Sequence, residues 1–332
     1  MLRFAVCGAG RIGRVHAANI AAHPSAEVAW VLDVDPAAAG ALAERAGGQA
    51  GEALEPVLDD VDAVLIGSPT PTHFDLIRTA AEAGKAIFCE KPVDLDLERV
   101  DAVVELVGRA RVPFFVGFNR RFDPSFARLK HRLVGGEIGA LEMLTLTSRD
   151  PSPPPPAYVK ASGGLFRDMM IHDFDMARWL IGGDPVEVYA TASNLVDPAL
   201  GAEGDVDTAV VVMRSESGAL VQISNSRRAA YGYDQRIEAF GSAGMLLAEN
   251  QAESSVVRFG ADGVVADRPQ PFFLERYEAA YRHELDHFVA AVTDEAPVLL
   301  TGPHDGRQAL ALAEAAVASL EKGTPVSFGT PR

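Results

Sequence analysis

The amino-acid sequence predicts two domains. The first is an α/β domain built on a parallel sheet (residues 1–120), and the second is an α+β domain with an open, mostly antiparallel sheet (residues 121–332). The chain has 332 residues, which is too long for one ordinary hydrophobic core. Up to residue 118, short continuous apolar runs alternate with helical stretches, as in a parallel sheet covered on both faces. After residue 120, strand-like segments follow one another across turns, which is typical of antiparallel pairing.

Strands and helices alternate throughout the first domain. The stretch PAAAGALAERAG, for example, opens on a proline and ends at a glycine, the usual signals of a helix start and stop. The expected strands are residues 3–8, 27–33, 62–68, 85–90 and 113–118, and the expected helices are residues 11–23, 36–47, 72–84 and 97–110.

The second domain is expected to begin with a helix (124–136) and a strand with alternating polar and apolar residues (140–150). The tract PSPPPP (151–156) is stiff and extended, and we interpret it as a rigid connector, with a pocket wall as the alternative. A helix over residues 167–179 follows. The remaining expected strands are 186–194, 207–215, 219–228, 235–242 and 244–250, and two helices (274–293 and 304–322) close the chain.

The composition argues against several classes of protein. A formal net charge of −16 repels nucleic-acid phosphates, so no nucleic-acid partner is expected. Cys7 and Cys89 lie in apolar runs, where we interpret them as small core residues, and two cysteines fit a reducing compartment. Neither a signal peptide nor an apolar run of membrane-spanning length is evident. We therefore expect a cytoplasmic protein with no membrane partner.

The segment GAGRIG has G-x-G-x-x-G spacing between a strand and a helix. Glycines here permit a tight turn and let backbone N–H groups approach a pyrophosphate at the helix start. Asp33 ends the second strand, where its carboxylate can accept hydrogen bonds from ribose hydroxyls and repels a 2′-phosphate. These features predict a Rossmann domain that binds NAD rather than NADP, with a ligand-free glycine turn as the alternative. The cofactor-binding residues expected in the turn are Gly8, Gly10, Arg11, Ile12 and Gly13.

Polar residues also follow two other strands, and ligands of open parallel sheets bind at the carboxyl ends of strands. The segment GSPTPTHFD offers two interpretations for each residue, contact with the cofactor or a capped helix start. The segment CEKPVDL places a lysine where its ammonium group can lie near a reacting oxygen, although a lysine after a strand is commonly only solvated. The residues expected here at the cofactor are Ser68, Pro69, Thr70, His73, Glu90 and Lys91.

The segment RDMMIHDFDMARW places Asp168, His172 and Asp175 on one narrow stripe of a helix that is otherwise mostly apolar. The stripe has no lysine, arginine or glutamate, so we expect it to face a polar cavity rather than solvent. Asp168 and His172 offer two metal ligands, but no third is evident at a matching spacing, so no metal is expected. His172 is suited to act as a general base near neutral pH, and Asp168 can orient it.

The segment RHELDHF contains the H-E-x-x-H spacing of zinc metalloproteases at His283, Glu284 and His287. The helix has its apolar face on the side opposite the two histidines, which we therefore expect to be solvated. A zinc site is not expected. The residues of that apolar face are Tyr281, Leu285, Phe288 and Val292.

Three motifs in this order, G-x-G-x-x-G, EKP (90–92) and GG…D…H..D (163–175), resemble those of the Gfo/Idh/MocA oxidoreductases, and the resemblance covers essentially the whole chain. Within that family, GAGRIGRVHA, GFNRRFDPSF and YGYDQR are most similar to inositol 2-dehydrogenases. The resemblance implies a Rossmann domain, an open-sheet domain and a homo-oligomer, a tetramer or dimer formed through that sheet. It implies Lys91, Asp168 and His172 as the catalytic set. The substrate-binding residues that it implies are Lys91, Asn119, Asp150, Asp168, His172, Asp175 and Tyr233.

The expected reaction is the NAD-dependent oxidation of a secondary hydroxyl of a cyclic polyol, with myo-inositol giving 2-keto-myo-inositol (scyllo-inosose). His172 takes the hydroxyl proton, a hydride moves to the nicotinamide, and Lys91 stabilises the developing alkoxide. The Pro-rich tract after Asp150 departs from the inositol dehydrogenases. The alternatives are scyllo-inositol, another inositol isomer or an aldose as substrate. A non-catalytic NAD-dependent sensor is a further alternative, but the presence of both Lys91 and His172 argues against it.

Overall fold

A computed structural model describes residues 1–293 and 298–329, and the chain divides into two compact units. The first unit comprises Met1–Phe122 and Ala279–Leu310, and the second comprises Asp123–Glu278 and Ala311–Arg332. The boundary expected after residue 120 thus lies at Phe122. Residues 279–310, which we expected in the second domain, group with the first unit instead.

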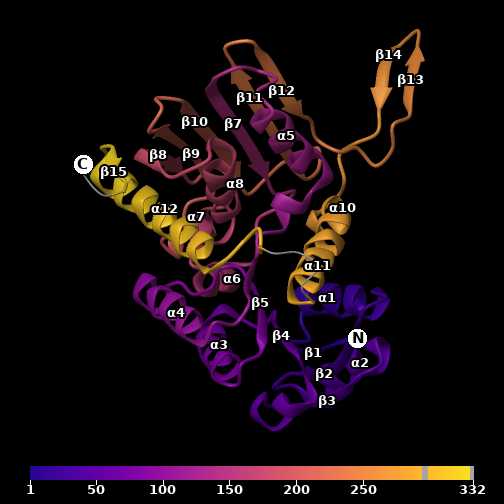
Figure 1. Ribbon diagram of the computed structural model, residues 1–332. Helices are drawn as coiled ribbons and strands as arrows, with labels where there is room; N and C mark the ends of the chain where they lie inside the picture. The colour runs from indigo at the N-terminus through magenta and orange to yellow at the C-terminus, as the bar shows by residue number, and fades with distance from the viewer. Residues whose placement is uncertain (294–297, 330–332) are drawn as a thin grey trace. The chain divides into compact units, whose positions relative to one another are not determined.

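The first unit is built on a six-stranded parallel sheet in the order β3-β2-β1-β4-β5-β6 (Figure 1). This is the doubly wound Rossmann order, with the strand order reversing between β1 and β4. The short strand β3 was not predicted. The strands are β1 (Leu2–Cys7), β2 (Ala26–Leu32), β3 (Gln49–Gly51), β4 (Ala63–Ile66), β5 (Ala86–Glu90) and β6 (Phe114–Gly117), and the crossover helices are α1 (Arg11–Ala22), α2 (Pro36–Ala46), α3 (His73–Glu82) and α4 (Leu97–Ala110).

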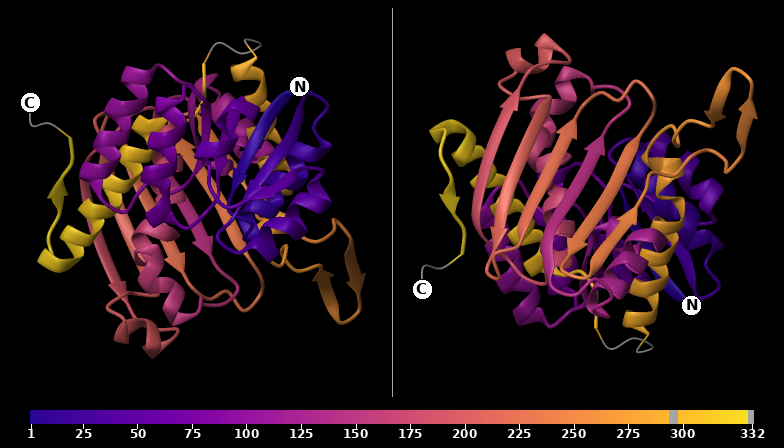
Figure 2. Two further views of the ribbon diagram at one scale, coloured as in Figure 1. Left: turned by 90° about the horizontal axis from the view of Figure 1, so that it is seen from below. Right: turned by 90° about the horizontal axis from the view of Figure 1, so that it is seen from above.

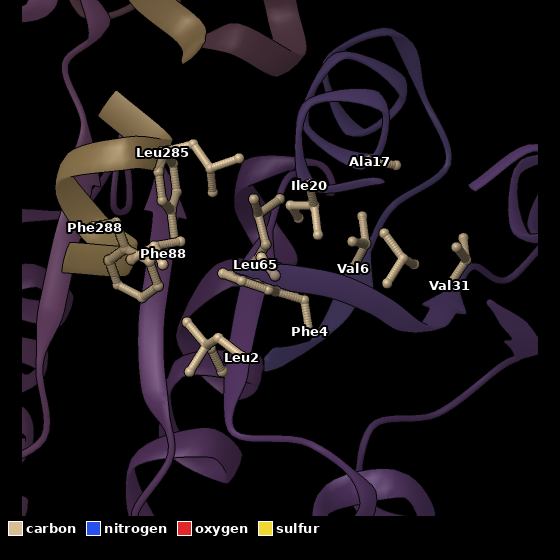
Figure 3. Packing of buried hydrophobic residues seen from close by; sticks show 14 of the residues in the cluster. Leu2, Phe4, Val6, Ala17, Ile20, Val31, Leu65, Phe88, Leu285 and Phe288 are labelled. Atoms are coloured by element: carbon tan, nitrogen blue, oxygen red, sulfur yellow. The ribbon is translucent and has the colours of Figure 1, made fainter. Parts of the chain in front are cut away.

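Helix α11 (Glu278–Val292), from near the end of the chain, supplies part of the core of the first unit. Leu285 and Phe288 are buried in the same cluster as Phe4 of β1 and Phe88 of β5, as Figure 3 shows. The ring centroids of Phe88 and Phe288 lie 5.5 Å apart. Burying a side chain of this size contributes about 1.5–3 kcal/mol. This apolar face of α11 therefore explains why a late segment belongs to the first unit.

The second unit is built on a seven-stranded sheet in the order β12-β11-β7-β10-β9-β8-β15. Strands β7 and β10 pair in parallel and the other neighbours are antiparallel, which confirms the open, mostly antiparallel sheet. The strands are β7 (Leu141–Arg149), β8 (Pro185–Ser193), β9 (Thr208–Ser215), β10 (Leu220–Ser226), β11 (Asp234–Gly241), β12 (Gly244–Ala248) and β15 (Val326–Ser327). The helices are α5 (Pro124–Val134), α6 (Pro156–Ser162), α7 (Gly164–Asp168), α8 (Ile171–Ile181), α9 (Pro198–Ala202), α10 (Phe273–Arg276) and the part of α12 (Pro303–Lys322) after Leu310.

One face of this sheet packs against helices such as α8, and the other, the open sheet face, has no described helix of the second unit on it (Figure 2). This open sheet face carries large apolar side chains. The strand register places seven of them on this same face. Each is between 38% and 50% exposed, which is unusual for a contiguous set of this size on a lone sheet. They are Met143, Tyr189, Val212, Leu220, Phe240, Met245 and Leu247.

A two-stranded hairpin, β13 (Val257–Gly260) and β14 (Gly263–Ala266), was not predicted and projects from the second unit (Figure 1). All eight of its strand residues are exposed, so it has no core-facing side from which alternation could be recognised in the sequence. In the part of the chain that the structure describes, no helix combines the length and the apolar character needed to cross a bilayer.

Candidate active site

The glycine turn after β1 has the geometry of a pyrophosphate-binding loop. Gly8 has a φ of +103°, and a Cβ there would lie 2.7 Å from the backbone nitrogen of Ser68. A Cβ on Gly13 would lie 1.8 Å from the carbonyl oxygen of Gly8, so α1 packs directly on the turn. Beside Gly10, by contrast, a Cβ would meet no described atom within 4 Å. The fold itself requires the first and third glycines, whereas the second leaves space at the start of α1 for a phosphate group.

Asp33 follows β2 and is held against this turn. Its Oδ2 accepts the backbone N–H of Ala9 at 2.7 Å, and its Oδ1 accepts that of Asp35 at 2.9 Å. The carboxylate is half-buried, and each oxygen retains a lone pair for a further hydrogen bond. The carboxylate and the open space beside Gly10 together fit a dinucleotide with an unsubstituted ribose.

His73 connects the loops that follow β4 and β5. Its Nε2 lies 2.9 Å from the carbonyl oxygen of Ser68, and its Nδ1 lies 2.9 Å from that of Pro92. Burial lowers the pKa of His73, while hydrogen bonds to the two carbonyls oppose that shift. Its role in the fold is to hold these two loops together. Direct contacts of Ser68, Pro69, Thr70 and His73 with the cofactor stay predictions.

Lys91 is the first residue after β5, and the residue before it is bound into the core. Glu90 Oε1 lies 2.6 Å from His16 Nε2, and Glu90 Oε2 accepts the backbone N–H of Lys91 at 3.3 Å. The Lys91–Pro92 peptide is cis. In the segment after β6, Asn119 is buried, and no described residue donates a hydrogen bond to its Oδ1.

In the second unit, the segment RDMMIHDFDMARW forms two helices rather than the one expected. Helix α7 ends at Asp168 and α8 begins at Ile171. The amides of Met169 and Met170 both donate to the carbonyl of Leu165, at 3.0 and 2.9 Å. Because two amides share one acceptor, the regular helical ladder is interrupted between Asp168 and His172. The single-helix phase used to place these residues on one stripe is therefore only approximate.

Asp168 takes part in a buried ion pair that the sequence did not reveal. Arg227, only 3% exposed, donates from Nη2 to Asp168 Oδ2 and from Nη1 to Asp150 Oδ2, both at 3.1 Å. Burial alone would lower the pKa of Arg227, but these two carboxylates raise it. The hydroxyl of Tyr158, on α6 after the Pro-rich tract, donates to Asp168 Oδ1 at 3.1 Å. Asp168 is thus held in place by a charged and a neutral donor.

The other expected substrate residues of this unit differ in burial. His172 is half-buried, whereas Asp175 and Tyr233 are buried, and the Tyr233 ring packs edge-on against Phe272. Asp173, the neighbour of His172, accepts hydrogen bonds from Ser148 and Asn225 and belongs to the interior.

The H-E-x-x-H segment does not bring its three side chains together. Glu284 is fully buried on one side of α11. His283 is exposed, as expected, but His287 is half-buried against the ring of Phe122 and accepts the backbone N–H of Leu300 at 2.9 Å. The expectation that both histidines are solvated was therefore wrong for His287, because the chain after α11 covers it.

Residues 2–118 match the model of an oxidoreductase family with an NAD-binding Rossmann fold, and residues 126–247 match the GFO/IDH/MocA C-terminal domain. Inositol 2-dehydrogenase of Rhizobium meliloti is 49% identical over 98% of this chain and 99% of its own. The scyllo-inositol 2-dehydrogenase (NAD(+)) of Bacillus subtilis is 37% identical over 100% of this chain and 97% of its own. A crystal structure of a myo-inositol dehydrogenase from Corynebacterium glutamicum superposes with a TM-score of 0.94 and 45% identity, with full coverage of both chains.

Proposed function

Because the chain belongs to the Gfo/Idh/MocA family of NAD-binding oxidoreductases, we propose that it oxidises myo-inositol to 2-keto-myo-inositol (scyllo-inosose) with NAD. The observation that carries this proposal is the full-length similarity to an inositol 2-dehydrogenase. The chain also has the lysine of the EKP motif, Lys91, and the D-x-x-x-H pair, Asp168 and His172. A non-catalytic sensor is disfavoured because it would not need these side chains. The substrate alternatives are scyllo-inositol, another inositol isomer or an aldose.

We propose that three residues perform the proton and charge chemistry. NAD, when bound, supplies the acceptor for the hydride that leaves the carbinol carbon. His172 accepts the hydroxyl proton on an imidazole nitrogen, and Asp168, itself held by Arg227, orients that ring. The ammonium group of Lys91 stabilises the negative charge that develops on the oxygen. Arg227 adds to the expected set as the residue that fixes the Asp168 carboxylate.

Recognition of a polyol ring requires polar partners for several hydroxyls, and a missing partner costs discrimination between stereoisomers. We assign this role to Asn119, Asp150, Asp175 and Tyr233. The buried Asn119 amide oxygen and the Asp150 carboxylate, which is fixed by Arg227 at 3.1 Å, support the assignment.

A substrate panel tests the proposed activity. Purified protein is mixed with NAD or NADP and with myo-inositol, scyllo-inositol, other inositol isomers and aldoses, and reduced cofactor is measured by absorbance. We expect the highest kcat/KM with myo-inositol and NAD. The preference for NAD over NADP is expected because Asp33 repels a 2′-phosphate. A preference for scyllo-inositol or an aldose would show that this compound, rather than myo-inositol, is the substrate. A higher rate with NADP would refute the role of Asp33.

We also propose that the chain forms a homo-oligomer through the open sheet face. Seven half-exposed apolar side chains on one face of the sheet form a patch suited to a second copy of the same sheet. A stable interface needs roughly 800 Å² from each partner, which a seven-stranded sheet can supply.

The substitution Leu220→Asp places a charge on the central strand β10 of this face. We expect it to shift the oligomer to monomers in light scattering, since an unpaired charge is costly at an apolar interface. Val134→Asp, at the exposed end of α5, is the matched control and should leave the mass unchanged. A monomeric wild-type protein, or an oligomer that survives Leu220→Asp, would contradict the proposal.

A further inference from the structure

Three ionisable side chains meet in the core of the first unit. His16 on α1, Glu90 at the end of β5 and Glu284 on α11 each place a nitrogen or oxygen atom within 4.8 Å of the other two. These residues are 0%, 7% and 0% exposed. The rings of Phe88 and Tyr281 lie edge-on to His16, with centroids 5.0 and 5.7 Å away. Because these groups have so little contact with water, an unpaired charge among them would cost much stability.

The contacts divide this cluster into a bonded pair and a third member. His16 Nε2 lies 2.6 Å from Glu90 Oε1. Among the described residues, none forms a hydrogen bond with either carboxylate oxygen of Glu284 or with His16 Nδ1. His16 and Glu90 are the ionisable partners of Glu284 in this cluster. Burial and the charge of Glu90 raise the pKa of Glu284 well above its usual value.

The distances in this cluster fit a protonated Glu284 better than a metal ion bound by the three residues. The 2.6 Å between His16 and Glu90 is a direct hydrogen bond. Two ligand atoms about 2.1 Å from a tetrahedral zinc ion are roughly 3.4 Å apart. A proton on Glu284 lets all three groups coexist without moving this pair.

We propose that His16 and Glu284 are positioning residues for Lys91, acting through Glu90 in a cluster that keeps a proton on Glu284. The inference rests on the catalytic role proposed for Lys91. Glu90 precedes Lys91 and accepts its backbone N–H, so the cluster holds the backbone from which the lysine side chain extends. A neutral Glu284 leaves Glu90 as the only carboxylate charge in the cluster. Ionisation of Glu284 would bring two like charges together and weaken the contact that holds the backbone of Lys91.

The first test uses Glu284→Gln, which preserves the shape of a neutral carboxylic acid. We expect the wild-type infrared spectrum to contain the carbonyl band of a protonated carboxyl group, and the variant to lack it. Glu284 keeps its proton when folded but loses it when unfolded above about pH 4.5. The wild-type protein is therefore expected to lose stability relative to Glu284→Gln as the pH rises above about 4.5. No such band, together with a variant destabilised equally at every pH, would show that Glu284 is ionised and overturn the proposal.

The second test examines the positioning role with two variants at His16. His16→Leu removes the donor to Glu90, and we expect kcat to fall at least tenfold with less than a twofold change in the Kd for NAD. His16→Gln offers an amide N–H in its place and should recover most of that loss. Equal kcat values for all three proteins, or parallel losses of kcat and NAD affinity, would refute the positioning role. The infrared and stability measurements need no substrate, so they remain decisive even if the wild-type protein oxidises no polyol, a result that would refute the proposed function.

Discussion

Replacing His172 with alanine is expected to lower kcat for myo-inositol by about 10²–10⁴-fold, the usual contribution of a general base. NAD binding should persist, because the glycine turn and Asp33 belong to the first unit and His172 belongs to the second. Cofactor binding by fluorescence and turnover by NADH absorbance separate the two effects.

His131→Ala is the matched control for this experiment. His131 is an exposed histidine on α5 in the same unit, so its removal should leave kcat within twofold. If His172→Ala retained wild-type turnover, another residue would have to take the hydroxyl proton, and the assignment of the D-x-x-x-H pair would fail.

Replacing Lys91 with methionine is expected to reduce kcat by about 10²–10³-fold, as the loss of one group that stabilises an oxyanion typically does. Methionine keeps much of the length and apolar stem of lysine but has no charge. KM for myo-inositol should change less than kcat, because the ammonium group acts mainly on charge that develops in the transition state.

Lys85→Met provides a control on the same strand. Lys85 immediately precedes β5 and Lys91 immediately follows it, so the two lysines lie at opposite ends of this strand. Ligands are expected to bind only at the carboxyl ends of the strands, and Lys85→Met should therefore retain activity. A similar loss in both variants would indicate damage to the strand rather than to the chemistry.

The glycine turn and the position of Asp33 were predictable because their signals are local. Gly8 and Gly13 are required by the tight packing of adjacent segments, and Asp33 lies at the end of the next strand. Each feature depends on strand–turn–helix periodicity that a short window of sequence contains. The alternation of strands and helices also predicted that the sheet is parallel, whereas the order of its strands came from the structure.

The substrate half was only partly predictable because its contacts are distant in sequence. Arg227 binds Asp168, which is 59 residues away, and Asp150, which is 77 away. The contact with Asp150 depends on the register of β7 and β10, which pairs Ser226 with Arg149, and no periodicity within either strand encodes that register. The contact with Asp168 depends on the placement of α7 beside the end of β10. The break after Asp168 was missed for a related reason. Met169 and Met170 look helical in sequence, but both amides donate to Leu165.

The contribution of α11 to the first unit has a consequence for synthesis on the ribosome. The N-terminal part of the unit ends at Phe122, but the segment that completes its core begins at Ala279, 157 residues later. At about 5–20 residues per second, the nascent chain waits roughly 8–30 s for that segment. During this time the surfaces of Phe4 and Phe88 that Phe288 later covers are exposed to chaperones. A ribosome that stalls before α11 should therefore carry a nascent chain that is more sensitive to protease than one that stalls after it.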